Sequence, residues 1–198
     1  MKLTIEPLTR ARWPDLVDLF SRPGGSVARG CYCMYYRRTG RLQVPEGLSY
    51  SETNKRLLEG LVDRGVVPGL LGYDAMGRAV AWVSLGPRGD FARLARSSVM
   101  KPVDDKPVWS IVCFFVDAKF RGRGLADAML DGALRWAREH GVTLIEGYPC
   151  DKAGRDRDDS MWFGSRTMFE RAGFVEVARR KAMRPFMRKT LRRRAGAT

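Results

Sequence analysis

Histidine is almost absent from this sequence of 198 residues, in which His140 is the only one. The four cysteines lack the C-x₂₋₄-C spacing that is typical of structural zinc sites; they are Cys31, Cys33, Cys113 and Cys150. We therefore expect no bound metal, and no Ser-His-Asp or Cys-His machinery built around His140. The cysteines are expected to be reduced thiols.

Long apolar runs are missing as well. No uninterrupted run approaches the ~18 residues of a membrane span, and the opening MKLTIEPLTRARW lacks the apolar core of a signal peptide. We therefore expect a cytoplasmic protein with no membrane partner. The length favours one domain over residues 1–198, with residues 192–198 as a flexible basic tail. A monomer or a homodimer is expected.

Acidic residues are few relative to basic ones, 22 against 36, which gives a formal net charge of +14. A surface of this sign attracts anions such as nucleic acid, acidic lipid or a phosphorylated cofactor. Much of the excess lies near the end of the chain, between Arg179 and Arg194. Charge alone does not choose among these partners, and a solubilising surface explains it equally well.

Apolar periodicity divides the chain into short strands and amphipathic helices. The predicted strands span residues 2–7, 69–74, 79–86, 108–116, 142–149, 174–180 and 184–191. The predicted helices span residues 12–20, 51–65, 125–140 and 165–173. This order indicates a mixed α/β domain, and the nearly unbroken apolar run 108–116 indicates a central strand that is covered on both faces.

The stretch VDAKFRGRGLADAML, residues 116–130, joins that central strand to the clearest helix. Gly122 and Gly124 let the backbone turn sharply and approach a ligand closely. The helix that begins at Leu125 presents unpaired amide groups and a partial positive charge at its start. Strand, glycine loop and helix N-terminus together form an anion cradle suited to a pyrophosphate, with Arg121 and Arg123 adding charge around it.

Two motifs resemble the GNAT acyltransferase superfamily. Arg121-x-x-Gly124-x-Ala126 after an apolar strand resembles its coenzyme A loop, with Ala118 in place of the usual proline. The segment MFERAGF, from Met168, resembles the closing LYEKLGF of that family. The resemblance covers nearly the whole chain. It implies the GNAT fold, a central mixed and mostly antiparallel sheet flanked by helices, in which strands four and five splay apart.

The resemblance also implies acetyl-coenzyme A as cofactor, and roles for residues of the central strand and its loop. Backbone groups of Phe114, Phe115 and Val116 would pair with the pantetheine arm. Amide groups from Gly122 to Ala126, including that of Leu125, would hold the pyrophosphate. Arg121 and Arg123 would shape the loop or meet cofactor phosphates, and the Val116 amide would polarise the acyl carbonyl.

The activity that the resemblance implies is N-acetyl transfer to the amine of a small molecule, such as an amino sugar, polyamine, amino acid or antibiotic. The positive charge argues mildly against a polycationic acceptor. Two alternatives stay open. The basic stretch from Arg179 to Arg194 favours an acyltransferase acting on aminoacyl-tRNA or on an RNA-associated substrate. Phe169, where the family often has a tyrosine acid, favours a non-catalytic acyl-coenzyme A sensor.

The general acid and base must then come from other residues. Glu146 and Tyr148 share one face of the strand 142–149 by alternation, so Glu146 is a candidate base and Tyr148 a candidate acid. Alternatively, Glu146 pairs with an arginine and Tyr148 packs in the core. Cys150 lies just past that strand and is either a site residue or a small apolar filler. Ser165 begins the helix beside the expected thiol position and either takes part or caps that helix.

The segment CYCMYYRR, residues 31–38, is unusually rich in aromatic and sulfur side chains. It lies between the first two predicted helices, where members of the family build the acceptor pocket. Cys31, Cys33, Met34 and Tyr35 are therefore candidates for an apolar wall against the substrate. A short buried element that carries core residues explains the segment equally well.

Overall fold

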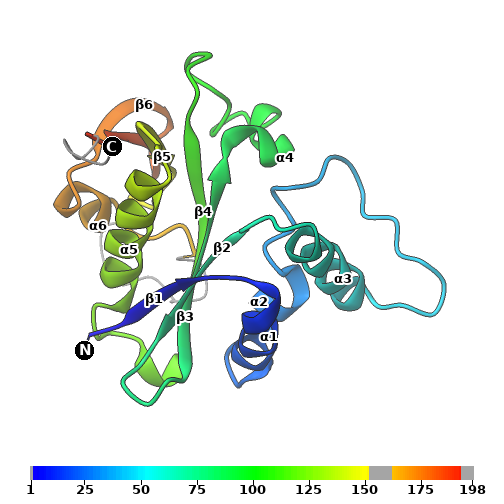
Figure 1. Cartoon of the computed structure of the whole chain (residues 1–198). Helices are drawn as coiled ribbons and strands as arrows, with labels where there is room; N and C mark the ends of the chain where they lie inside the picture. Colours follow the sequence, from blue (N-terminus) through cyan, green and yellow to red (C-terminus); the bar gives the residue numbers. More distant parts are fainter. Residues whose placement is uncertain (1, 152–161, 193–198) are drawn as a thin grey trace.

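The computed structural model describes residues 2–151 and 162–192, which fold around a seven-stranded sheet (Figure 1). Across the sheet the strands follow the order β1-β2-β3-β4-β5-β7-β6. Their bounds are β1 Thr4–Pro7, β2 Gly69–Tyr73, β3 Ala79–Pro87, β4 Trp109–Val116, β5 Leu144–Gly147, β6 Val175–Lys181 and β7 Arg184–Thr190. All neighbouring strands are antiparallel except β4 and β5, which are parallel. The predicted mixed, mostly antiparallel sheet is confirmed.

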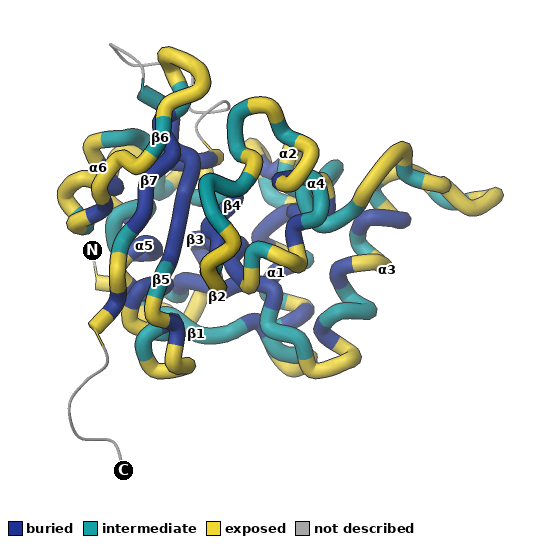
Figure 2. The backbone as a smooth tube through the Cα atoms, turned by 90° about the horizontal axis from the view of Figure 1, so that it is seen from above, coloured by how far each residue is buried: buried dark blue, intermediate teal, exposed yellow. Residues whose placement is uncertain are grey.

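Helices cover both faces of the sheet (Figure 1). They are α1 Trp13–Ser21, α2 Ser26–Cys31, α3 Tyr50–Asp63, α4 Ala92–Ala95, α5 Leu125–Glu139 and α6 Arg166–Arg171, with single 3-10 turns η1 Arg10–Arg12, η2 Arg88–Asp90 and η3 Ala118–Phe120. Helices α5 and α6 pack on one face, around Met129 and Phe169. Helices α1 and α3 pack on the other, around Phe20, Leu58 and Trp82. Buried positions follow the central strands, and exposed ones gather on helices and loops (Figure 2).

The two long amphipathic helices α3 and α5 form where their sequences predict them. At the start of α3, Ser49 and Glu52 make the reciprocal hydrogen bonds of a capping box. In α5, a Cβ on Gly132 would lie 2.2 Å from the Ile5 side chain, so only glycine lets the helix come this close to β1. The buried stripe of α5, which includes Met129, therefore lies directly on the sheet.

The parallel pair β4–β5 is short, and this opens the sheet. Only Trp109, Ser110 and Ile111 of β4 pair with β5, and β5 ends at Gly147. Strand β4 continues to Val116, so its second half has no β5 partner. The strands therefore splay apart, as the family resemblance implies.

Several boundaries differ from the predictions. Helix α2 begins within the stretch 21–30, where glycines and a proline predict a loop, and ends at Cys31, and α4 lies in the unassigned stretch 87–107. Strand β5 is shorter than the predicted strand 142–149. Residues 193–198 of the predicted basic tail lie outside the described residues. No described helix has both the length and the apolar character needed to cross a membrane.

Candidate active site

The loop between β4 and α5 is anchored at its start by the buried carboxylate of Asp117. That carboxylate accepts hydrogen bonds from the Arg22 guanidinium at 3.1 Å and from the Lys119 backbone N–H at 3.0 Å. Arg121 then turns back on the strand, and its Nε donates to the Val116 carbonyl at 3.2 Å. These hydrogen bonds fix the backbone conformation of the loop, so Arg121 shapes the loop in this structure.

The loop ends in an open backbone cradle. Gly122 and Gly124 have φ values of 72° and 74°, which L side chains disfavour. A Cβ at either position would have no atom within 4 Å, so the backbone faces open space. Gly124 is the N-cap of α5, and no described side chain caps the amide groups that follow from Leu125. They are therefore available to an anion.

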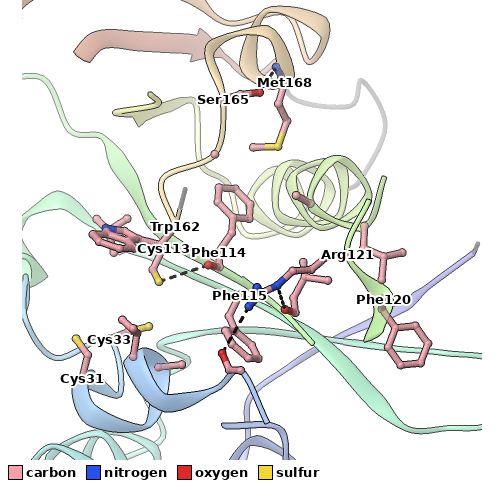
Figure 3. A pocket seen from close by; sticks show the side chains of 18 of the residues that line it. Cys31, Cys33, Cys113, Phe114, Phe115, Phe120, Arg121, Trp162, Ser165 and Met168 are labelled. Carbon is pink, nitrogen blue, oxygen red and sulfur yellow. Dashed lines mark hydrogen bonds between the residues drawn. The ribbon is translucent and has the colours of Figure 1, made fainter. Parts of the chain in front are cut away.

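A cavity of about 820 Å³ adjoins this cradle, where β4 has separated from β5 (Figure 3). One end is formed by the glycine loop and the first turn of α5, and the other by α2 and the segment that follows it. Figure 3 shows Cys31 and Cys33 at one end and Phe120 at the other. Among the residues predicted to bind the cofactor, the following line the cavity: Phe114, Phe115, Val116, Arg121, Gly122, Gly124, Leu125 and Ala126. Arg123 lies outside this lining, with its guanidinium 5.5 Å from the centre of the Phe120 ring.

The backbone of β4 requires one correction to these predictions. The Phe114 N–H donates to the Trp162 carbonyl at 2.6 Å, so Phe114 faces the splay. Because backbone groups alternate along a strand, Val116 faces the splay too, whereas Phe115 faces β3, where it pairs with Trp82. The Phe115 backbone therefore cannot pair with a ligand in the splay, although its side chain lines the cavity.

Glu146 and Tyr148 lie away from the cavity, in a buried polar network. Their exposed fractions are 0% and 1%. The Glu146 carboxylate accepts hydrogen bonds from the Tyr148 hydroxyl at 2.6 Å, from Ser110 at 3.1 Å and from Arg188 Nε at 3.0 Å. Arg188 also binds Asp104 at 2.7 Å and 3.0 Å. Burial raises the pKa of Tyr148 well above its usual value. The structure therefore corrects the predicted base and acid: both residues serve the fold.

Cys150 and Ser165 join the two chain segments that flank the undescribed residues 152–161. The Cys150 N–H donates to the Gly164 carbonyl at 2.9 Å, and its carbonyl accepts from the Arg166 N–H at 2.9 Å. Cys150 is buried in a hydrophobic cluster and does not line the cavity. Ser165 caps α6, because its Oγ accepts from the Met168 N–H at 3.2 Å, and it also lines the cavity.

Phe169 is a core residue in this structure. Its ring is buried, and it makes edge-to-face contacts with Phe114 and Phe174 at centroid distances of 6.3 Å and 4.8 Å. A Cβ on Gly147 would lie 2.2 Å from this ring, so the end of β5 must be glycine. The neighbouring Met168 lines the cavity instead. Replacement of the usual tyrosine by Phe169 therefore leaves a purely apolar contact at this position.

The end of α2 and the segment after it form the end of the cavity that lies away from the glycine loop. Cys31, Cys33 and Tyr35 line the cavity, whereas Met34 is buried in the core beneath them. Cys33 has a φ of 53° and accepts a hydrogen bond from Trp82 Nε1 at 3.3 Å. Burial raises the pKa of Cys31, which keeps its thiol protonated.

A third thiol, Cys113 of β4, lies on the same wall (Figure 3). Its Sγ donates a weak hydrogen bond to the Phe114 carbonyl at 3.8 Å. Interaction with the Cys33 thiol, together with burial, raises the pKa of Cys113 well above its usual value.

Two lining tyrosines were missed by the sequence predictions. Tyr36 and Tyr50 both line the cavity. The Tyr36 hydroxyl makes no hydrogen bond with a described residue, and burial raises the pKa of Tyr36 to about 12. Its ring packs on Tyr35 and Phe163 at centroid distances of 4.9 Å and 5.6 Å. The only sequence signal for Tyr36 is its place in the run CYCMYYRR.

The basic stretch near the end of the chain uses several arginines internally. Arg179 pairs with Glu176 and Asp151, and Arg188 belongs to the buried network. Arg180 donates to carbonyl groups of the 99–102 segment, and Arg184 lies over the Phe163 ring. Folding therefore engages these charges, and none of these contacts favours a nucleic-acid site.

Comparison with known proteins places this geometry in context. Residues 39–154 match the acetyltransferase (GNAT) family. No curated protein matches the chain. Among solved structures, the chain is similar to an acetyltransferase of the GNAT family from Listeria monocytogenes, with 13% identity, coverage of 96% of this chain and 95% of that one, and a TM-score of 0.58.

Two further structures share the fold. The first is described as histone acetyltransferase HPA2 and related acetyltransferase from Corynebacterium glutamicum, with 18% identity, 96% coverage of both chains and a TM-score of 0.54. The second is the PaiA N-acetyltransferase from Thermoplasma acidophilum in complex with coenzyme A, with 13% identity, coverage of 96% of this chain and 99% of that one, and a TM-score of 0.51.

Proposed function

Because this chain belongs to the acetyltransferase (GNAT) family, whose acyl donor is acetyl-coenzyme A, we propose that it transfers an acetyl group directly to the primary amine of a small molecule. One observation carries the proposal: the open glycine cradle at the start of α5 leads into a single cavity of about 820 Å³ that continues past β4. The cavity offers room for a donor at one end and a small acceptor at the other.

The residues of the cradle fit a coenzyme A pyrophosphate. Gly122 and Gly124 leave open space where a side chain would stand, and the uncapped amide groups at Leu125 and Ala126 can donate to phosphate oxygens. Along β4, the backbone of Val116 faces the splay and can bind the donor near its acyl group. Arg121 keeps the loop in the conformation that exposes these amides.

Acetyl-coenzyme A, when bound, would supply the acyl carbon and the leaving thiolate: the carbon–sulfur bond would break as the amine nitrogen bonds to that carbon, and the amine would lose one proton while the sulfur gains one. The chain contributes proximity, an apolar surrounding and a proton donor. We assign the proton-donor role to Tyr36, because it lines the cavity and its hydroxyl makes no hydrogen bond with a described residue. Water can accept the proton that the amine loses.

The proposal is tested by calorimetric titration with acetyl-coenzyme A, followed by an assay of free thiol release with a panel of primary amines. We expect saturable binding and amine-dependent thiol release. Binding without turnover across the panel would show an acyl-coenzyme A sensor instead. A well-folded protein that binds no acetyl-coenzyme A would contradict the transferase assignment at its cradle.

A further inference from the structure

The acceptor end of the cavity differs chemically from the cradle end. Its described walls are apolar, aromatic or thiol side chains, contributed by α2, the segment after it, the start of α3 and the middle of β4. Among the lining residues that the structure describes, the one carboxylate is that of Asp127, which lies in the first turn of α5 at the cradle end and pairs with Arg171. An ammonium group at the acceptor end therefore meets no described counter-charge.

The mouth of this end is ringed by exposed apolar side chains. Val27, Tyr35, Tyr50 and Trp162 all line the cavity and have exposed fractions of 58%, 43%, 48% and 36%. Exposed apolar side chains that gather around a cavity, rather than lying singly, mark a binding surface for an apolar ligand. A ligand with a flat apolar body would remove these side chains from water.

Two guanidinium groups give the mouth a positive charge. Arg93 lies 4.1 Å from the centre of the Tyr35 ring, and Arg38 lies 5.2 Å from that of Tyr50. Arg93 donates to the Gly40 carbonyl and Arg38 to the Tyr50 hydroxyl, and neither forms an ion pair with a described acid. Their charge is therefore not compensated by a described carboxylate, and it repels a second positive charge on the acceptor.

We propose that the acceptor is a primary amine on an aromatic body without a second positive charge, bound between the tyrosines of α3 and of the segment after α2. This inference rests on the proposed acetyl transfer and names the substrate class of the same site. Arylalkylamines and aromatic amino acids belong to this class, whereas polyamines and aminoglycosides do not. The chemistry is consistent with the absence of a base among the described residues at this end: desolvation among apolar walls favours the neutral form of the amine, which is the nucleophile.

The test compares phenethylamine with 1,6-diaminohexane, which has similar reach but a second ammonium group. Each amine is titrated into protein saturated with coenzyme A, and each is assayed for thiol release with acetyl-coenzyme A. We expect phenethylamine to bind and to react with at least about tenfold higher kcat/KM, because only the diamine brings a second positive charge near Arg38 and Arg93. Equal or better use of the diamine would overturn the inference.

Two variants locate the effect. Tyr50→Ala should raise the KM for phenethylamine about tenfold and leave acetyl-coenzyme A binding unchanged. Leu57→Ala is the matched control, because Leu57 lies on the same helix with an exposed fraction of 41% but does not line the cavity. Val27→Asp should shift the preference toward the diamine by supplying a carboxylate that the described residues at this end do not provide, whereas Val177→Asp, on β6, should not. No shift with Val27→Asp would contradict the inference.

The outcomes also separate this inference from the proposed function. Phenethylamine that binds but is never acetylated would contradict the transfer and leave the aromatic site intact. Acetylation of the diamine, with no binding of phenethylamine, would support the transfer and overturn the aromatic acceptor. If no amine binds or reacts, both proposals fail.

Discussion

The two halves of β4 lie in one strand and yet meet opposite surroundings. Over Trp109–Ile111 the strand pairs with β5, and the buried polar groups beside it satisfy one another through Glu146 and Arg188. Over Val112–Val116 the strand has no β5 partner, and a cavity with aromatic walls and an open glycine loop lies beside it. We call Trp109–Ile111 the closed half of the strand and Val112–Val116 the open half. Glu146 and Tyr148, beside the closed half, are residue types that often act in catalysis, but they are buried and do not line the cavity.

This difference teaches that access, rather than residue type, separates structural from functional groups in this fold. The closed half holds its charges in a network that excludes solvent, which is costly to break. The open half holds hydroxyl and thiol groups that face a cavity and retain capacity for a ligand. Variants in the two halves should therefore differ in kind: the first group changes the free energy of unfolding, and the second changes binding.

The largest expected effect comes from opening the closed half. Arg188→Met leaves Arg88, at 3.7 Å, as the one described cation beside the buried Glu146 carboxylate, so we expect the free energy of unfolding to fall by about 3–5 kcal/mol. Urea denaturation measures it. Arg171→Met, which breaks an exposed pair with Asp127, should cost at most about 1 kcal/mol. Equal losses of unfolding free energy in the two variants would show that the buried network contributes no more to stability than an exposed ion pair does.

Phe169→Tyr tests whether a hydroxyl at this position, next to Gly147 at the end of β5, stays buried in the core or reaches the cavity. Its ring lies against Gly147 in the core, so a hydroxyl there would be buried without a partner and should cost about 1–3 kcal/mol in unfolding free energy. Acetyl transfer should not rise, because the side chain does not line the cavity. A clear gain in kcat would show instead that the new hydroxyl reaches the leaving thiolate.

Gly124→Ala tests the open half against a matched glycine. Gly124 and Gly141 lie at opposite ends of α5 with φ values of 74° and 73°, and a Cβ on either meets nothing within 4 Å. Each alanine should therefore cost a similar ~1–2 kcal/mol of backbone strain in unfolding free energy. Only Gly124→Ala should weaken acetyl-coenzyme A binding, by about tenfold or more, as calorimetry measures. Unchanged binding would remove Gly124 from the cofactor site.

The smallest expected effect is a pH dependence from Tyr36. Its pKa is raised by burial from 10.0 to about 12, so the native state keeps a proton that the unfolded state releases. The stability due to this group is therefore present below pH 10.0 and is lost as pH rises through about 12. Tyr36→Phe should cost less unfolding free energy at about pH 11 than at about pH 9, by less than ~1 kcal/mol. A loss of unfolding free energy that grows with pH would contradict the raised pKa of Tyr36 in the native state.

Local signals predicted the cradle, whereas long-range contacts decided the rest. Gly122, Gly124 and the helix from Leu125 are neighbours in sequence, so the pattern alone indicates the loop. The partner of Glu146 is Arg188, 42 residues later in sequence, and no local pattern reveals that pairing. The sequence order of strands and helices likewise predicts the sheet, but not which residues face its splay.

The sequence also failed to predict the direction in which several side chains point. Phe169 aligns with the family's tyrosine, but whether its ring points to the cavity or to the core depends on how α6 packs on Gly147. In the run CYCMYYRR, Cys31, Cys33 and Tyr35 reach the cavity and Met34 does not, because the left-handed turn at Tyr32 and Cys33 rotates the chain. Such a turn in non-glycine residues has no clear sequence signature.

Trp162 gives the protein an intrinsic fluorescent label at the candidate site. Its indole stands at the cavity mouth, more exposed than the buried Trp13 and Trp82, and its carbonyl binds β4 at Phe114. Among the cavity-lining residues that the structure describes, it is the one tryptophan. Its fluorescence should therefore become less accessible to a soluble quencher when the cavity is filled, so that occupancy can be followed in real time without a modified ligand.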